Sequence, residues 1–233
     1  MAKHTGARLA VLVSGRGSNF EALHLGLQAQ ADQPAHIVGL ISDQPQALAL
    51  EKAKRFAVPS QIIDRKHYQS KAAFESALVD ALQALNPDWI VLAGFMRVLS
   101  ADAIAPFAGR MINIHPSLLP KHRGLHTHER VLAANETVHG ASIHFVTPEL
   151  DGGPILSQVS MAVEDHDDPD ALAERLLPLE HRLMRATVAL LATNEVKCGH
   201  GEITVNGQVL GQPLRLGHDL DDHGQRMDQP DPR

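Results

Sequence analysis

The sequence predicts an α/β fold with a doubly wound, mostly parallel sheet and a C-terminal β-hairpin. First, short apolar runs of strand length alternate with helical periodicity between residues 8 and 95. Second, residues 89–95 (WIVLAGF) are apolar without alternation, which is typical of a central parallel strand covered on both faces. Third, a glycine-rich loop follows the first strand, at an edge where such sheets bind ligands.

The predicted elements follow one another in order. Apolar or alternating runs predict strands at 8–13, 35–43, 61–64, 89–95, 110–115 and 140–146. Apolar residues at three- and four-residue spacing predict helices that begin near residue 20, at 47–56 and around 74–85. A long helix starts at Asp168-Pro169, and Pro178 inside it is expected to kink or interrupt it at a cost of about 3 kcal/mol.

Composition narrows the class of protein. The chain has 233 residues, 44% of them hydrophobic, and can bury a full core. Its formal net charge of −6 argues against a general nucleic-acid binder. The single cysteine, Cys198, excludes an intramolecular disulfide and suits a reducing compartment. There is no signal peptide and no apolar run of the roughly 20 residues that a membrane span needs, so a cytoplasmic protein without a membrane partner is expected.

The glycine loop Ser14–Asn19 lies between a strand and a helix. This arrangement points backbone N–H groups and a helix N-terminus at an anion. The loop is neither a P-loop, because no Gly-Lys-Ser/Thr follows, nor a dinucleotide fingerprint, because Phe20 occupies the third glycine position. In the dinucleotide reading Asp43 could have served the ribose. The structural alternative is a capping box of Ser18 and Glu21, but capping does not require two glycines, so a monophosphate site is favoured.

Asn113 and His115 lie on one face of a predicted strand that ends before Pro116. An amide donor beside an imidazole is the pair that acyl transfer uses to stabilise an oxyanion and move a proton. The alternative is an edge strand whose polar face meets water. The glycine loop, the segment 94–97 and His115 all fall at carboxyl ends of strands, which favours a functional site.

Asp151 opens a tight Asp-Gly-Gly-Pro loop. A carboxylate near an imidazole favours the charged imidazolium and raises its pKa, as a general acid at neutral pH requires. The alternative for Asp151 is an ordinary turn residue. Ser142 and His144 share one face of the alternating strand before this loop.

The loop 121–128 is rich in histidine and raises the question of a metal. His126 and His128 have no carboxylate or cysteine partner at convincing spacing, so zinc is disfavoured and a mobile loop over the site is predicted. Glu180 flanks the apolar stripe of the long helix, where a solvated carboxylate is the alternative to a ligand contact.

The C-terminal region contains a hairpin at 202–210 with an Asn-Gly turn. The residues from about 218 onwards are rich in Asp, Gly and Pro and are expected to be disordered. The predicted organisation is a catalytic domain at 8–196, a hairpin extension at 197–217 and a tail at 218–233.

Five motifs together resemble one family. They are Ser14–Asn19 (SGRGSN), Ala93–Leu99 (AGFMRVL), Asn113–Pro120 (NIHPSLLP), Gly124–His128 (GLHTH) and Glu149–Pro154 (ELDGGP). In register from about Arg8 to Ala192, they resemble phosphoribosylglycinamide formyltransferase, the folate-dependent enzyme of purine biosynthesis, which has a Rossmann-like formyltransferase fold.

The resemblance implies roles for individual residues. Asn113, His115 and Asp151 match the catalytic trio, and Glu180 matches a carboxylate that contacts the glycinamide. Gly17, Ser18 and Asn19 match the loop that binds the ribose phosphate. The residues implied to bind folate are Lys71, Met96, Arg97, Val98, Leu99, Asn113, Thr147, Pro148, Glu149, Leu150 and Asp151.

Three positions depart from the family pattern. Lys71 stands where relatives often have arginine, so a bidentate contact with a carboxylate is lost although the charge remains. Arg123 replaces a proline expected before Gly124, and Pro178 lies two residues before Glu180.

The implied reaction transfers a formyl group from 10-formyltetrahydrofolate, as cosubstrate, to the glycinamide amine, without metal or ATP. His115 would act as acid and oxyanion stabiliser, Asn113 as oxyanion donor, and Asp151 as proton relay that raises the histidine pKa. The partners implied are small molecules, with a monomer or homodimer. The alternatives are a formyltetrahydrofolate hydrolase and an enzyme like methionyl-tRNA formyltransferase, although the latter would need a basic RNA-binding domain. A nicotinamide dehydrogenase is disfavoured by Phe20, and a non-catalytic phosphate-binding module leaves the trio unexplained.

Overall fold

A computed structural model describes residues 6–199 and 201–227. The chain forms two compact units. The first comprises Met1–Asn113 and Val146–Pro148, and the second comprises Ile114–Phe145 and Glu149–Arg233. The boundary crosses one strand, between Asn113 and Ile114, and the predicted hairpin extension lies within the second unit.

The first unit contains a parallel sheet with the strand order β5-β4-β1-β2-β3. All four strand pairs in it are parallel, as the alternation of strands and helices predicts. The strands are β1 (Ala7–Val13), β2 (Ala35–Ser42), β3 (Ser60–Ile62), β4 (Trp89–Leu92) and β5 (Met111–His115), of which Met111–Asn113 belong to this unit.

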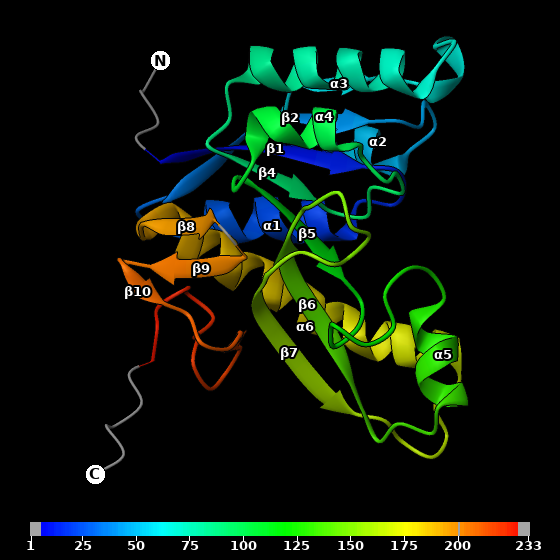
Figure 1. The fold of residues 1–233 in the computed structure, drawn as a ribbon, viewed down its shortest axis with the longest axis vertical. Helices are drawn as coiled ribbons and strands as arrows, with labels where there is room; N and C mark the ends of the chain where they lie inside the picture. The colour runs from blue at the N-terminus through cyan, green and yellow to red at the C-terminus, as the bar shows by residue number, and fades with distance from the viewer. Residues whose placement is uncertain (1–5, 200, 228–233) are drawn as a thin grey trace. The chain divides into compact units, whose positions relative to one another are not determined.

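Helices cover both faces of this sheet (Figure 1). One group is α1 (Ser18–Ala29) with α2 (Leu48–Arg55), and the other is α3 (Lys71–Leu85) with the short α4 (Ala101–Ile104). Two short 3₁₀ helices, η1 (Arg65–His67) and η2 (Ala105–Phe107), complete the unit.

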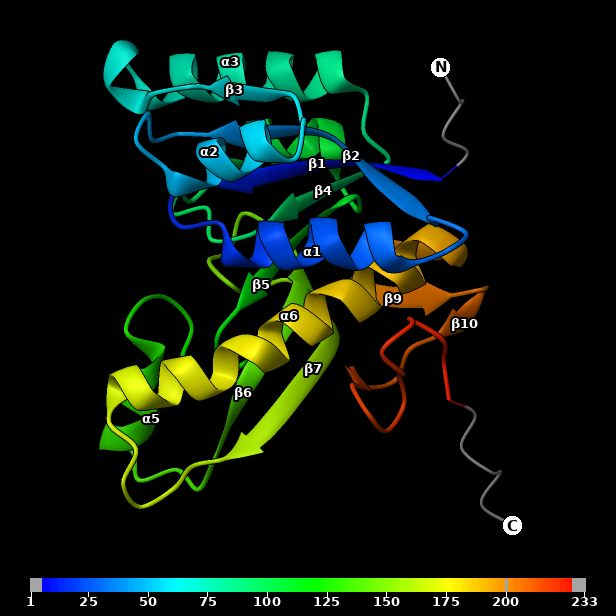
Figure 2. The same ribbon diagram turned by 180° about the vertical axis from the view of Figure 1, so that it is seen from behind.

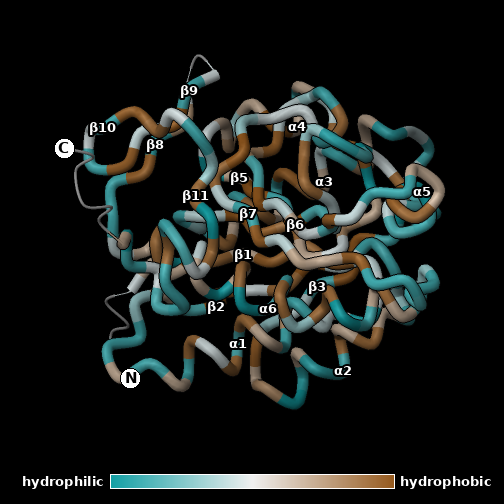
Figure 3. The backbone as a smooth tube through the Cα atoms, turned by 90° about the horizontal axis from the view of Figure 1, so that it is seen from below, coloured by the Kyte–Doolittle hydropathy of each residue, from teal (hydrophilic) through white to brown (hydrophobic). Residues whose placement is uncertain are grey.

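The core explains why β1 and β4 are apolar. Ala10 and Leu12 on β1 belong to a cluster with Phe74 and Leu78 of α3, while the alternate residues of β1 are also fully buried. Because both faces of the strand are covered, its sequence does not alternate. Apolar residues gather along the strands, whereas hydrophilic residues line the outer loops (Figure 3).

The second unit is built on the strand order β11-β7-β6. The strands β6 (Val138–Phe145) and β7 (Ile155–Ala162) are antiparallel, and β11 (Leu214–Arg215) pairs with β7 in parallel. The long helix α6 (Pro169–Thr193) packs along β6 and β7 and contacts α5 (Thr127–Ala133), as Figure 2 shows.

The sequence predicts that Pro178 kinks or interrupts the long helix. Helix α6 is continuous through Pro178, so the predicted interruption is wrong, and the kink stays a prediction. The proline is exposed, while Leu172, Leu176 and Leu183 of the same helix are fully buried. Burial of a leucine stabilises by about 1.5–3 kcal/mol, so the stripe offsets the missing hydrogen bond. Asp168 accepts a hydrogen bond from the Ala171 N–H at 2.8 Å and caps the helix as predicted. Within residues 6–199 and 201–227, no helix is long and apolar enough to cross a membrane.

The predicted hairpin is confirmed. The strands β9 (Glu202–Val205) and β10 (Gln208–Val209) are antiparallel and join β8 (Val196–Gly199) in a separate small sheet. Asn206 and Gly207 have φ angles of 51° and 78°, as the tight turns that favour Asn-Gly require.

The segment from His218 to Met227 differs from the predicted disorder. Leu220 is fully buried, and Arg182 of α6 makes a bidentate ion pair with Asp222. Gly224 lies so close to α6 that an added Cβ would sit 2.5 Å from the backbone nitrogen of Leu190. One buried leucine and one close glycine contact therefore fix a stretch whose composition suggests disorder. Residues 228–233 of the predicted tail lie outside the described residues.

Candidate active site

His115 is the last residue of β5, where the sequence placed it, and it is 6% exposed. Its Nδ1 lies 3.4 Å from Oδ2 of Asp151, and its Nε2 lies 3.0 Å from the carbonyl oxygen of His122. The structure therefore brings together two of the three predicted catalytic residues. Asn113 lies two positions earlier on the same strand and shares the strand face of His115.

Asp151 is held in an unusual backbone conformation, with a φ of 47°. Its Oδ2 accepts a hydrogen bond from the Gly124 N–H at 2.8 Å, so a loop that contains a family motif fixes the carboxylate. A Cβ at the next residue, Gly152, would overlap the side chain of Glu149, which explains the need for glycine there. The loop is therefore specialised to present one carboxylate rather than to make a simple turn.

His144 is a further member of this site, and no local sequence pattern marks it as one. It is 2% exposed, and its Nε2 lies 3.6 Å from Oδ1 of Asp151. Its Nδ1 faces the carbonyl oxygen of Phe145 at 3.0 Å, which orients the ring. The alternation of β6 put His144 on one face with Ser142, but only the fold shows that this position meets Asp151.

Burial dominates the electrostatics of His115 and lowers its pKa. The carbonyl of His122 and the charge of Asp151 act in the opposite direction without overcoming burial. Burial alone would raise the pKa of Asp151, but hydrogen bonds from His144 and Gly124 and the charge of His115 bring it below its usual value. Asp151 therefore acts on His115 in the predicted direction, but burial outweighs it, and the pKa of His115 lies below rather than above its ordinary value in the protein without substrates.

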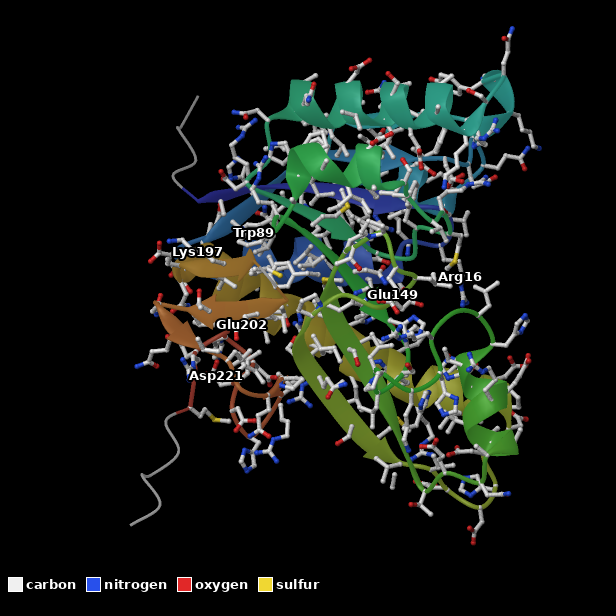
Figure 4. All side chains as sticks on the ribbon, viewed as in Figure 1. Arg16, Trp89, Glu149, Lys197, Glu202 and Asp221 are labelled. Atoms are coloured by element: carbon white, nitrogen blue, oxygen red, sulfur yellow. The ribbon has the colours of Figure 1, made fainter. Side chains whose placement is uncertain are left out.

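Within the glycine loop, Gly17 occupies a position that strongly favours glycine. Gly17 is the N-cap residue of α1 with a φ of 66°, and an added Cβ would lie 2.6 Å from the Cβ of Ala49. Gly17 has no side chain to cap the helix, so the alternative of a Ser18–Glu21 capping box is wrong; Glu21 instead pairs with Lys52 at 2.7 Å. Arg16 is exposed on the loop (Figure 4). Because no side chain at the N-cap position bonds to them, the backbone N–H groups of the first turn of α1 can donate to an anion.

A cavity of about 440 Å³ adjoins this loop. Ser14, Gly15 and Arg16 line one part of it, and Gln44, Met96 and the start of α2 line the rest. It lies at carboxyl ends of parallel strands, where α/β sheets bind small molecules.

The segment Met96–Leu99, predicted to bind folate, begins two residues after Gly94, which has a positive φ of 79°. Met96 and Val98 are exposed, at 67% and 51%, whereas Leu99 is buried. The guanidinium of Arg97 donates from Nε to Oδ2 of Asp43 at 2.6 Å. Asp43 is thus bound by other side chains rather than available to a nucleotide ribose.

The other predicted binding residues are spread over both units. Lys71 begins α3, with its Nζ 3.6 Å from Oε1 of Glu75. Arg123 and Glu149 form an ion pair, so the arginine that departs from the family pattern has a definite partner. Glu180 is half-buried within α6. Thr147 and Pro148 belong to the first unit, and Leu150 is half exposed in the second.

The histidines of the 121–128 loop have individual partners. His122 contacts Glu136 at 2.9 Å, His126 contacts Glu129 at 3.1 Å, and Nδ1 of His128 lies 3.0 Å from Nε2 of His139. Across the described part of the chain, no group of three or more His, Cys, Asp or Glu side chains is arranged to hold a metal ion.

Comparison with known proteins identifies the family. Residues 7–188 match the sequence model of the family described as Formyl transferase. The chain is 35% identical to phosphoribosylglycinamide formyltransferase of Escherichia coli, over 87% of this chain and 95% of that protein. It is also 39% identical to the trifunctional purine biosynthetic protein adenosine-3 of Bos taurus, over 83% of this chain, and it spans only 19% of the length of that relative.

Solved structures agree with the sequence comparison. The phosphoribosylglycinamide formyltransferase of Coxiella burnetii matches with a TM-score of 0.84 and 37% identity, covering 88% of this chain and 96% of that one. The enzyme of Brucella melitensis matches with a TM-score of 0.77 and 44% identity, covering 84% of this chain and 100% of that one. The chain therefore belongs to the formyl transferase family, among the phosphoribosylglycinamide formyltransferases.

Proposed function

We propose that the chain transfers the formyl group of 10-formyltetrahydrofolate to the amine of N1-(5-phosphoribosyl)glycinamide, in de novo purine biosynthesis. The observation that carries the proposal is the buried pair of His115 and Asp151 at the end of β5, with Asn113 on the same strand. Family membership supplies the reaction, and this pair supplies groups that can perform it.

The reaction begins when the glycinamide amine attacks the formyl carbon. The resulting tetrahedral intermediate has an oxyanion, an ammonium nitrogen and an intact bond to N10 of the folate. Asn113 donates its amide N–H to the oxyanion. Nε2 of His115 leaves the carbonyl oxygen of His122 and donates its N–H to the same oxyanion. Such donors are worth most in a water-excluded site, and His115 is buried.

The lowered pKa of His115 fits a relay rather than a preformed acid. A neutral imidazole can accept the proton that the ammonium nitrogen loses, by way of Asp151 or water. The oxyanion then adds its negative charge to that of Asp151, which raises the pKa of the ring and opposes the effect of burial. The imidazolium protonates N10, the C–N10 bond breaks, and the formyl carbonyl forms again. His115 ends the cycle neutral, as it began.

The same proposal places the substrates. Gly17, Ser18 and Asn19 bind the ribose phosphate through the loop and the N-terminus of α1. Glu180 contacts the glycinamide. The folate lies along Met96–Leu99 and Thr147–Asp151, with Lys71 as a cationic contact. A catalytic domain at residues 8–196 and a monomer or homodimer in solution remain part of this proposal.

An acceptor assay tests the proposed function. Purified protein is mixed with 10-formyltetrahydrofolate and, in separate samples, with the ribosylglycinamide, formylatable tRNA or no acceptor, and tetrahydrofolate is followed by absorbance. Product only with the ribosylglycinamide is expected. Release of formate without acceptor would indicate a hydrolase, and turnover only with tRNA would indicate the other formyltransferase.

Variants test the assigned roles. His115→Ala and Asp151→Asn are each expected to lower kcat by about 10²–10⁴. His67→Ala serves as the matched control, because the side chain of His67 is 79% exposed and should not affect turnover. Near wild-type rates in either catalytic variant would refute the assignment.

A further inference from the structure

Asp43 and Glu75 lie outside the catalytic trio, and both carboxylates are almost fully buried. Asp43, at the end of β2, is 1% exposed, and Glu75, on α3, is 5% exposed. Burial of a charge is costly unless hydrogen bonds and opposite charges compensate. Both carboxylates contact the same short stretch, Gly94–Ser100, which contains the proposed folate-binding residues.

Asp43 contacts that stretch and the glycine loop together. Its Oδ2 accepts from Nε of Arg97 at 2.6 Å, and its Oδ1 accepts from the hydroxyl of Ser14 at 2.5 Å. Ser14 is the first residue of the glycine loop, and its oxygen in turn accepts from the Met96 N–H at 2.8 Å. The Ser14 N–H also donates to the Gly94 carbonyl at 2.9 Å. Gln44 adds a third donor to the carboxylate at 3.1 Å.

Glu75 binds the other end of Gly94–Ser100 through hydrogen bonds and makes no contact with Ser14 of the glycine loop. Its Oε1 accepts from the Ser100 N–H at 2.9 Å, and its Oε2 accepts from the Ser100 hydroxyl at 2.6 Å. Its charged partner is Lys71, which lies on the same helix. Glu75 therefore offers a natural control: it is a buried carboxylate that fixes the same stretch without the link to Ser14.

We propose that Asp43 is a positioning residue that couples the binding of the phosphorylated substrate to the binding of the folate. Through Ser14 it fixes the glycine loop, and through Arg97 it fixes the folate stretch, so ordering one orders the other. The identity of the two ligands rests on the proposed function, whereas the hydrogen-bond network does not.

Coupling of this kind is reciprocal and can be measured. If the phosphorylated ligand tightens the binding of folate, folate tightens the binding of the phosphorylated ligand by the same factor, typically about 5- to 150-fold. Without the shared carboxylate, each ligand must order its own segment, and the factor falls towards one.

The experiment measures the Kd of folic acid, which has the pterin but no formyl group, by calorimetry. Each titration is run without and with saturating N1-(5-phosphoribosyl)glycinamide, and the ratio of the two Kd values is the coupling factor. Wild type is expected to give at least about fivefold. Asp43→Ala and Ser14→Ala are expected to give a ratio near one. Glu75→Ala is expected to weaken folic acid binding by the same factor in both titrations and keep the ratio.

The conservative variant adds a graded result. In Asp43→Asn the amide oxygen can face Arg97 and the amide nitrogen can face Ser14, so the geometry survives without the charge. An intermediate ratio is therefore expected. If Asp43→Ala does not fold, Ser14→Ala, which removes only one hydroxyl, carries the test.

Three results would overturn the proposal. They are a wild-type ratio near one, ratios in Ser14→Ala and Asp43→Ala that match wild type, or a ratio in Glu75→Ala that falls as far as the ratio in Asp43→Ala. Failure to bind folic acid overturns it as well. Because no formyl group is transferred in these titrations, a protein that shows the expected ratios but fails the acceptor assay would refute the proposed function and leave the coupling in place.

Discussion

His139 is expected to make the folded protein less stable in mild acid. Its ring is 1% exposed on β6, and its Nδ1 has no hydrogen-bond partner among the described residues. Its Nε2 lies 3.0 Å from Nδ1 of His128. Burial and, second, the neighbouring charge of His128 lower the pKa of His139 from 6.5 to about 4. The structure thus holds this ring neutral at pH values where the unfolded chain would protonate it.

The sign and size of the effect follow from proton linkage. Between pH 6.5 and 4 the unfolded state binds more protons than the folded state, so stability falls as the pH is lowered. With a pKa of about 4 when folded and 6.5 when unfolded, the loss at pH 5 relative to pH 7.5 is about 2 kcal/mol. It reaches about 3 kcal/mol below pH 4.

The test compares urea unfolding of wild type and His139→Gln at pH 7.5 and pH 5, followed by circular dichroism. Glutamine keeps a polar group near the Nε2 position but cannot titrate. The variant is expected to lose about 2 kcal/mol less than wild type between the two pH values. His67→Gln, at an exposed position, should behave as wild type. Equal pH dependence in wild type and His139→Gln would refute the reasoning.

Three further predictions concern the loop, the C-terminal segment and the relay. Gly17→Ala should raise the KM for the ribonucleotide and cost about 1–2 kcal/mol in urea unfolding, because the left-handed backbone and the close Ala49 both oppose a Cβ; an unchanged KM would contradict it. Gly224→Ala should destabilise by about 1–3 kcal/mol through overpacking against the backbone of α6, measured by thermal or urea unfolding. Asp151→Asn should move the acid limb of kcat/KM to lower pH as well as lower the rate, because the carboxylate raises the pKa of His115 and its loss lets that pKa fall further. A pH profile with an unmoved limb would argue against the relay.

Much of the fold and part of the site could be predicted because they depend on local pattern. The unalternating run around Ile90 requires cover on both faces, and the proline after His115 ends the strand where the ring is needed. Parallel strands bring their carboxyl ends to one edge, so the loop at Gly17 and the stretch at Met96 fall together within the first unit.

What could not be predicted depends on neighbours that are remote in sequence. The pKa of His115 is lowered because of what covers the ring, and the sequence shows only the charge of Asp151. The hydrogen bond of Ser14 to Asp43 joins residues 29 positions apart, and nothing local marks either as part of a network. Leu220 is one leucine in a polar stretch, yet it is fully buried. The composition of a segment does not show the contribution of a single leucine, although the burial of that leucine helps to hold the segment in place.

The short strand β11 also covers part of a sheet edge that could otherwise pair with a strand of a second molecule. Leu214 and Arg215 pair with Ser157 and Gln158, and they occupy the outer edge of β7. A chain that ended before Leu214 would leave those backbone groups of β7 open to a strand from another molecule. Shortening the protein at its C-terminus, a common step in preparing crystals, is therefore expected to promote aggregation even if the residues of the catalytic site are untouched.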